Sequence, residues 1–113
     1  MENCLFCKMI SGEMPVKKVY ENKDMIIIND INPQAPIHYL MIVKHHYKLL
    51  SEQKNEDVKI LGECLHKLAE LRCELGLDGG YRLVINQSDD AGQTVPHLHV
   101  HILAGKKMDW NPA

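Results

Sequence analysis

The sequence lacks any long hydrophobic stretch. Its longest apolar run is residues 39–43, whereas a helix that crosses a bilayer needs about 20 apolar residues. The N-terminus carries Glu2 where a secretory signal would carry a basic residue, and no apolar stretch follows it. We therefore expect a cytoplasmic protein with no membrane partner.

The sequence also lacks a concentration of basic residues. Thirteen Lys and Arg against fifteen Asp and Glu give a net charge of −2, and the bases are scattered. Because proteins that hold a nucleic-acid polymer usually present a basic surface, we expect no such partner, although a mononucleotide remains compatible. The apolar fraction of 45% and charged fraction of 25% are ordinary for a globular chain, and the length predicts a single domain over residues 1–113.

The order of the expected elements predicts an α+β domain. Strands are expected at residues 18–20, 25–30, 37–43, 81–86 and 98–103, with a short helical turn after Cys7. Apolar residues with a period near 3.6 predict one long helix from Asn55 to Leu75, capped by Asn55 and ended by a left-handed Gly76. Strands in runs around one long helix favour an antiparallel sheet. Cys64 and Cys73 follow the helical pattern and are expected to be core thiols.

Histidine is the most unusual feature of the sequence. Three of the seven histidines, His97, His99 and His101, alternate with apolar residues in residues 97–103. Successive side chains of a strand point to opposite faces, so the three histidines should share one face while their apolar neighbours face the core.

Three interpretations of this histidine face are open. A solvated polar face is the simplest, but other polar residues serve that purpose equally well. Imidazoles two residues apart can also bind one metal ion. Alternatively, a neutral imidazole can attack phosphorus when its other nitrogen is held as N–H, while flanking imidazoles bind phosphoryl oxygens. The spacing alone does not choose between metal binding and nucleophilic catalysis.

Residues 92–103, Gly-Gln-Thr-Val-Pro-His-Leu-His-Val-His-Ile-Leu, resemble the signature of the histidine-triad (HIT) superfamily of nucleotidyl hydrolases and transferases. Residues 30–38 resemble its nucleotide-pocket segment, and residues 86–90 its loop before the triad. The tail at residues 108–112 resembles that of the Hint branch, the purine nucleoside phosphoramidases. A third triad histidine in place of Gln separates the chain from the uridylyltransferase branch. The resemblance implies the HIT fold, with about five antiparallel strands, one long helix and a short N-terminal helix.

The resemblance also implies roles for individual residues. The catalytic residues would be His97, His99, His101 and His38. His99 would be the nucleophile that forms a nucleotidyl-histidine intermediate, with His38 near the α-phosphate or leaving group. His101 and Thr94, with backbone N–H groups near Gln93, would bind phosphate oxygens. The ribose contacts would come from Asp30 and Asn86, and the apolar base slot from Phe6, Ile10, Ile28 and Ile31. Each of three residues also has a purely structural alternative: His38 as a core histidine, Asp30 as a turn cap and Thr94 as a loop hydroxyl.

The activity implied is hydrolysis of nucleoside 5′-phosphoramidates or related nucleoside monophosphate conjugates, with adenosine preferred and no catalytic cofactor. The alternatives are a dinucleoside polyphosphate hydrolase of the same superfamily and a nucleotide-binding regulatory module with incidental catalysis. Hint proteins are homodimers in which one tail reaches the partner's site. We therefore expect Trp110 near the partner's substrate, and an interface made by residues 55–75 and 81–86.

The cysteine pair Cys4 and Cys7 allows three interpretations: a redox pair, half of a zinc site, or two free thiols. A thioredoxin-like pair should precede a helix inside a βαβ unit, whereas this pair opens the sequence. His46 and His97 are candidates to complete a zinc site. Many bacterial HIT proteins carry such a Cys-Cys-His-His site, and on that resemblance we favour structural zinc that fixes the N-terminal segment.

Overall fold

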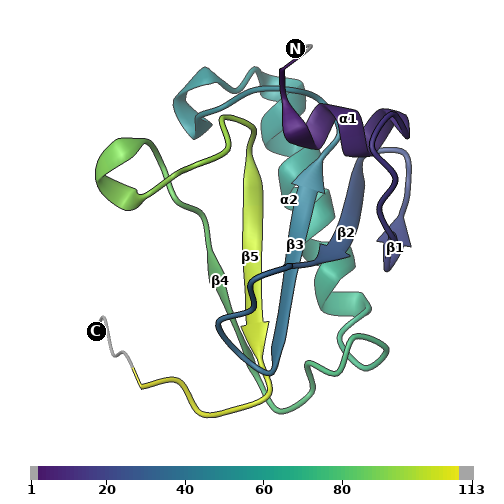
Figure 1. Ribbon diagram of the computed structural model, residues 1–113, viewed down its shortest axis with the longest axis vertical. Coiled ribbons are helices and arrows are strands. Elements are labelled where there is room, and N and C mark those ends of the chain that lie inside the picture. Colours follow the sequence, from purple (N-terminus) through teal and green to yellow (C-terminus); the bar gives the residue numbers. More distant parts are fainter. Residues whose placement is uncertain (1–2, 110–113) are drawn as a thin grey trace.

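The computed structural model describes residues 3–109 and contains one five-stranded antiparallel sheet with strand order β1-β2-β3-β5-β4 (Figure 1). The elements are α1 (Leu5–Ser11), β1 (Tyr20–Glu21), β2 (Met25–Asn29), β3 (Ile37–Val43), η1 (Leu50–Glu52), α2 (Asn55–Glu70), β4 (Tyr81–Val84), η2 (Asp89–Ala91) and β5 (His99–Ala104). This architecture confirms the α+β class and the antiparallel sheet. Over the range described, the helices are too short or too polar to cross a membrane.

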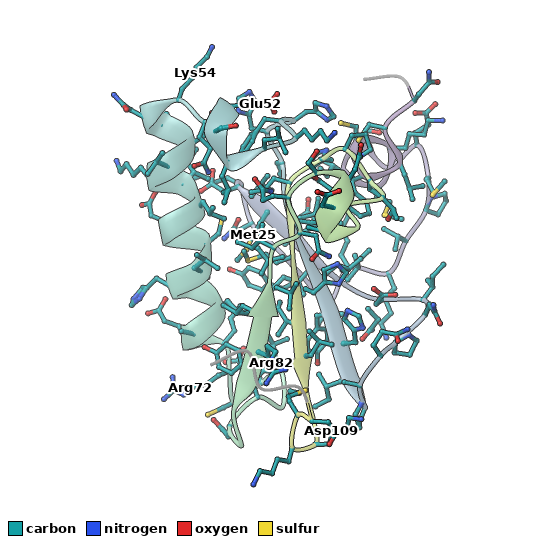
Figure 2. The ribbon with its side chains drawn as sticks, turned by 90° about the vertical axis from the view of Figure 1, so that its left-hand side faces the viewer. Met25, Glu52, Lys54, Arg72, Arg82 and Asp109 are labelled. Carbon is teal, nitrogen blue, oxygen red and sulfur yellow. The ribbon has the colours of Figure 1, made fainter. Side chains whose placement is uncertain are left out.

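The two helices lie on opposite faces of the sheet. Figure 2 shows the sheet between α2 on one side and the N-terminal helix on the other, with Met25 between α2 and the strands. One apolar cluster joins α2 to the sheet and includes Met25, Met41, Leu68 and Ile102. A second cluster lies beneath α1 and comprises Cys4, Phe6, Ile26, Ile28, Leu40 and Ile42. Because both faces are covered, β2 is buried on both sides and its apolar residues do not alternate with polar ones.

The strand register brings histidines from distant parts of the sequence together. In the pairing of β3 with β5, His38 lies opposite Leu103 and Leu40 lies opposite His101. His38 and His101 are therefore diagonal neighbours on one face, close enough for long side chains to meet. The site described below follows from this register.

The ends of α2 differ from the sequence prediction. Asn55 is the first helical residue rather than the cap, and the Asp57 carboxylate accepts the backbone N–H of Lys54 at 3.0 Å. The helix ends at Glu70 rather than at Leu75. Leu71 and Leu75 still pack in the α2 cluster from turns that follow the helix, which is why the apolar period outlasts it. Gly76 does adopt a left-handed conformation, with φ +77°, at the end of those turns.

The N-terminal helix begins earlier than predicted. Cys4 caps α1 by accepting the backbone N–H of Cys7 on its sulfur at 3.4 Å, so Cys7 lies inside the helix. Cys64 is buried, as predicted, but the prediction for Cys73 is wrong. Its exposed thiol donates to Asp78 Oδ1 at 3.2 Å, because the chain has already left the helix at that position.

Candidate active site and metal-binding cluster

Residue alternation along β5 separates its histidines from its apolar residues. Val100 and Ile102 are fully buried in the α2 cluster. His99 and His101 project from the opposite face, where the Phe6 ring of α1 packs edge-on against His99 at a centroid distance of 5.0 Å. His97 precedes the strand and is completely buried. The strand thus presents two imidazoles to the α1 side of the sheet.

These two imidazoles form part of a cavity of about 290 Å³. Small-molecule sites start at about 300 Å³, so the cavity is large enough for part of a nucleotide-sized ligand. It is lined by Leu5, Phe6 and Met9 of α1, by Ile28, Asn29, Asp30, Ile31 and Leu40 of the β2–β3 region, by Asn86, Gly92, Thr94 and Val95 of the β4–β5 loop, and by His99 and His101. Apolar walls from α1 and β2 therefore lie in the same cavity as hydrogen-bonding groups from the loop and β5.

Most of the residues that the sequence analysis selected for substrate binding line this cavity. The exceptions are Ile10, which packs in the second apolar cluster, Gln93 and His38. Leu5, Met9, Asn29, Leu40, Gly92 and Val95 line the cavity and were not anticipated. A helix that starts at Leu5 places residues 5, 6 and 9 on one face. Leu5 and Met9 were therefore missed because the helix was expected to start only after Cys7. Trp110 lies outside the described residues.

The His99 ring is fixed in one tautomer by a backbone carbonyl. Its Nδ1 lies 2.7 Å from the oxygen of His97, and since a carbonyl oxygen can only accept, Nδ1 carries the proton and donates. Burial lowers the pKa of His99 below its ordinary value, which favours the neutral ring. The neutral ring then has an unprotonated Nε2, which is the form a nucleophile requires.

A backbone amide fixes the tautomers of the neighbouring histidines, His38 and His101, in a similar way. The N–H of Gln34 donates to His38 Nδ1 at 3.0 Å, so the neutral His38 ring carries its proton on Nε2. That nitrogen lies 2.9 Å from Nδ1 of His101 and donates to it. His101 therefore carries its own proton on Nε2, and burial lowers its pKa, which keeps this ring neutral as well. His38 lies behind His101 and orients it, rather than lining the cavity itself.

Asp30 contributes to the same cluster. Its Oδ1 accepts the N–H of Asn32 at 2.8 Å, so it does stabilise the turn after β2. Its Oδ2 lies 3.4 Å from His38 Nε2 and 3.9 Å from His101 Nδ1, close enough for the three side chains to share one ion. A metal would need the lone pair of His38 Nε2, which would move the proton to Nδ1, against the N–H of Gln34. The arrangement therefore favours a hydrogen-bonded chain over a metal site.

Gln93 holds the loop that carries Thr94. Its Oε1 accepts the N–H of Ser88 at 2.8 Å, and its Nε2 donates to the carbonyls of Lys48 and Val95 at 3.2 and 3.4 Å. Ser88 has a φ of +67°, which a residue with a side chain adopts only when other contacts hold it there. The side chain of Gln93 thus fixes the β4–β5 loop where it forms a cavity wall.

A second cluster, the Cys/His cluster, consists of Cys4, Cys7, His46 and His97, whose ligand atoms all lie within 4.8 Å of one another. Cys4 Sγ is 3.3 Å from His97 Nδ1, and Cys7 Sγ is 3.3 Å from His46 Nδ1 and 3.6 Å from His97 Nδ1. The two Nδ1 atoms are 3.0 Å apart. The fold thus brings together the four residues that the sequence analysis grouped.

The Cys/His cluster fits a tetrahedral zinc ion. Bonds of about 2.3 Å to sulfur and about 2.0 Å to nitrogen would put the two nitrogens about 3.3 Å apart and each sulfur about 3.5 Å from a nitrogen. His97 is also in the tautomer of a ligand, because its Nε2 donates to the carbonyl of Val43 at 2.6 Å and leaves Nδ1 free to coordinate. All four positions would be occupied by protein, which is typical of structural zinc.

The position of the cysteine pair in the fold argues against the redox interpretation. The pair opens a seven-residue helix that is not part of a βαβ unit. Burial, reinforced by the neighbouring Cys4 thiol, raises the pKa of Cys7 to about 11, so this thiol is protonated at neutral pH unless a metal ion binds it.

Comparison with known proteins agrees with this site. The HIT domain family matches residues 11–108, and the chain belongs to that family. A HIT family hydrolase from Legionella pneumophila has a similar structure, with a TM-score of 0.90 and 41% identity over 98% of this chain and 100% of that one. A histidine triad protein from Clostridium difficile superposes with a TM-score of 0.91 at 39% identity, over 98% of this chain and 97% of that one. A HIT-like protein of Synechocystis sp. is 43% identical over 111 residues, 98% of this chain and 97% of its own length.

Proposed function

We propose that this protein is a nucleotide hydrolase that cleaves nucleoside 5′-phosphoramidates and related nucleoside monophosphate conjugates, adenosine conjugates in particular. The observation that carries the proposal is the 2.7 Å hydrogen bond from His99 Nδ1 to the carbonyl of His97. It leaves an unprotonated imidazole nitrogen on a ring that lines a cavity large enough for part of a nucleotide. Membership of the HIT family and the similarity to a HIT family hydrolase support the same activity.

The reaction proceeds in two displacements. His99 Nε2 attacks the α-phosphorus, a nitrogen–phosphorus bond to the protein forms, and the bond from phosphorus to the leaving amine breaks as the amine takes up a proton. Water then attacks the nucleotidyl-histidine, which releases the nucleoside monophosphate and regenerates the imidazole. His101 Nε2–H donates to a phosphoryl oxygen, because its Nδ1 is already engaged by His38.

The rest of the cavity binds the nucleotide. The purine lies among the apolar side chains of Phe6, Ile28 and Ile31. Asp30 accepts hydrogen bonds from the ribose hydroxyls, and the Asn86 side chain can donate to the ribose or accept from it. Thr94 and the backbone around Gln93 bind the phosphate together with His101. The protein works in the cytoplasm as a single HIT domain.

Trapping the intermediate tests the proposal. Wild-type protein mixed with an adenosine phosphoramidate and quenched in base should gain the mass of one adenylyl group, on the peptide that contains His99. His99→Asn should form no adduct, lose at least about 1,000-fold in turnover, and still bind AMP. His66→Asn, on the exposed side of α2, is the matched control and should behave as wild type. AMP binding by a wild-type protein that forms no adduct and has no turnover would identify a nucleotide-binding module instead.

We further propose that the Cys/His cluster binds one structural zinc ion per chain. The donor set and its distances support this assignment. Protein purified without chelators should contain about one zinc per chain by elemental analysis, and Cys4→Ser combined with Cys7→Ser should contain none and should melt at lower temperature. An absence of zinc from the wild-type protein would leave two free thiols as the better account.

The functional unit that we propose is a homodimer. The outer edge of β4 pairs with no strand among residues 3–109, and Leu83 on that strand is 41% exposed. By the resemblance to the Hint branch, the tail with Trp110 reaches the partner's cavity. Deletion of residues 108–113 should therefore leave a dimer and change kcat/KM among leaving groups more than it changes AMP affinity.

A further inference from the structure

The helix α1 is part of two sites at once. Cys4 caps its N-terminus and Cys7 lies in its first turn, and both belong to the Cys/His cluster. Leu5, Phe6 and Met9 of the same helix line the cavity. A helix of seven residues has almost no stability of its own, so the position of this cavity wall depends on what holds α1 to the sheet.

Two anchors hold α1. One is Phe6, which is 3% exposed and packs in the second apolar cluster. The other is the Cys/His cluster, which joins the two thiols of α1 to His46 after β3 and to His97 before β5. Leu5 is exposed, whereas Met9 and Ile10 are partly buried and pack against the same apolar cluster as Phe6. Loss of the Cys/His cluster would therefore leave α1 held by apolar packing alone, in which Phe6 is the one side chain that is almost fully buried.

The nucleophile does not depend on α1 in this way. His99 belongs to the central strand β5, and its tautomer is fixed by the carbonyl of His97, a group of the same strand segment. The backbone of this segment is also held by a hydrogen bond from the N–H of Leu98 to the carbonyl of Tyr47 at 2.7 Å. A displaced α1 would therefore change the cavity wall, including the Phe6 ring that packs against His99, and leave the hydrogen bond that fixes the His99 tautomer in place.

We propose that Cys4 and Cys7 are positioning residues for nucleotide binding: through the Cys/His cluster they hold α1, and so the occupancy of the cluster by a metal sets the affinity of the cavity for the nucleotide. This inference rests on the function proposed above. The inference predicts that disruption of the cluster changes nucleotide binding and not the rate of the chemical step. Disruption of the cluster raises the AMP dissociation constant and KM, and kcat at saturation is retained.

The test compares Cys7→Ser with Cys64→Ser as the matched control. Cys64 is also a buried thiol, but it lies on α2, across the sheet from the cavity. AMP affinity is measured by calorimetry, zinc by elemental analysis, and the protection of residues 5–11 by hydrogen exchange. Cys7→Ser should lose zinc, exchange faster over α1 and bind AMP at least about tenfold more weakly, with kcat within about threefold of wild type. Cys64→Ser should keep its zinc, its α1 protection and its AMP affinity.

Wild-type protein stripped of zinc by a chelator gives the same comparison where Cys7→Ser does not fold. An unchanged AMP affinity in protein whose α1 exchanges faster would overturn the inference, as would unchanged exchange over α1 after zinc loss. A fall in kcat at unchanged AMP affinity would also overturn it, because the cluster would then act on His99 through His97. These outcomes leave the proposed function standing, whereas wild-type protein that binds no AMP would overturn the proposed function itself.

Discussion

Two backbone groups decide which histidine nitrogens can react. The carbonyl of His97 holds the proton of His99 on Nδ1, and the amide of Gln34 holds that of His38 on Nε2. Because His38 Nε2–H donates to Nδ1 of His101, the His101 ring carries its own proton on Nε2. The unprotonated Nε2 of His99, the proposed nucleophile, and the N–H of His101 are thus on neighbouring rings, whose centroids are 5.2 Å apart.

Replacement of His38 should lower kcat, through its effect on His101, more than it lowers nucleotide affinity. In His38→Leu, which is nearly isosteric, Nδ1 of His101 loses its donor and the ring is free to place its proton on either nitrogen. We expect kcat to fall by about 100-fold while AMP affinity changes much less. Nitrogen-15 NMR of the imidazoles measures the tautomer directly and should show His101 as the Nε2–H form in wild type only. An unchanged tautomer in the variant would show that His38 does not orient His101.

The sequence predicted which residues form the site better than it predicted how they are held. The alternation around residues 97–103 was enough to place His99 and His101 on one face, opposite the core. It did not show that His38 would lie behind His101, because that depends on the register of β3 with β5. The hydrogen bond by which the Gln93 side chain holds the β4–β5 loop depends on the positive φ of Ser88, which no residue pattern in the sequence predicted.

At the scale of secondary structure, Asp57 joins the start of α2 to the end of β3. Its Oδ2 accepts the N–H of Lys54, and its Oδ1 lies 2.6 Å from His45 Nδ1, beyond the last residue of β3. The sequence analysis took Asn55 for the cap because its residue type and position fit. The contact with His45 explains why the carboxylate two positions later is buried and takes that role.

Asp57→Ala should therefore lower the free energy of unfolding by about 1–2 kcal/mol, as the loss of a helix cap does. The N–H of Lys54, then His45, lowers the pKa of Asp57 below 3.8. A carboxylate with a lowered folded-state pKa stabilises the fold above its unfolded pKa and loses that contribution as the pH falls through the folded value. The difference between wild type and Asp57→Ala should be full at neutral pH and shrink below about pH 4. Urea denaturation at several pH values measures it.

Asp57→Asn is the control for this prediction. It keeps an oxygen that can accept the N–H of Lys54 but cannot ionise, so it should lose less stability than Asp57→Ala. The difference between the two variants should not depend on pH. A difference between wild type and Asp57→Ala that stayed constant down to pH 2 would show that the charge of Asp57 does not contribute to the fold.

At the scale of the whole molecule, one stripe on α2 is only partly covered by residues 3–109. Val58, Gly62, Leu65 and Ala69 are spaced by four, three and four residues, so they form one stripe on the helix, of which Leu65 also packs against the core. Val58 is 57% exposed, and a Cβ added at Gly62 would meet no atom within 4 Å. Glycine in the middle of a helix costs about 1 kcal/mol relative to alanine, and here no contact within the chain requires it.

A second copy of the chain, in the homodimer proposed above, would cover this stripe, because small and apolar side chains allow two helices to pack closely. The exposed Leu83 of the edge strand β4 lies opposite Ile102 and is therefore on the α2 face of the sheet. An interface that includes both elements, as the sequence analysis expected, would cover the stripe and Leu83 together. We therefore predict that Gly62→Trp is monomeric by light scattering with detection at several concentrations, while its far-ultraviolet circular dichroism is that of wild type. The large ring would occupy the space that the partner helix needs, and its Cβ meets no atom of residues 3–109 within 4 Å.

Glu63→Trp is the matched control. Glu63 is the next residue along α2 and is exposed, but the helical rotation of about 100° per residue turns it away from the stripe. It should remain a dimer, with the same melting temperature dependence on concentration as wild type. AMP binding should survive in monomeric Gly62→Trp, since the residues proposed to bind the base, ribose and phosphate belong to one chain and the partner's tail is proposed to act on the leaving group. A dimeric Gly62→Trp would place the interface elsewhere, and a wild-type monomer at micromolar concentration would leave the stripe without a partner of its own kind.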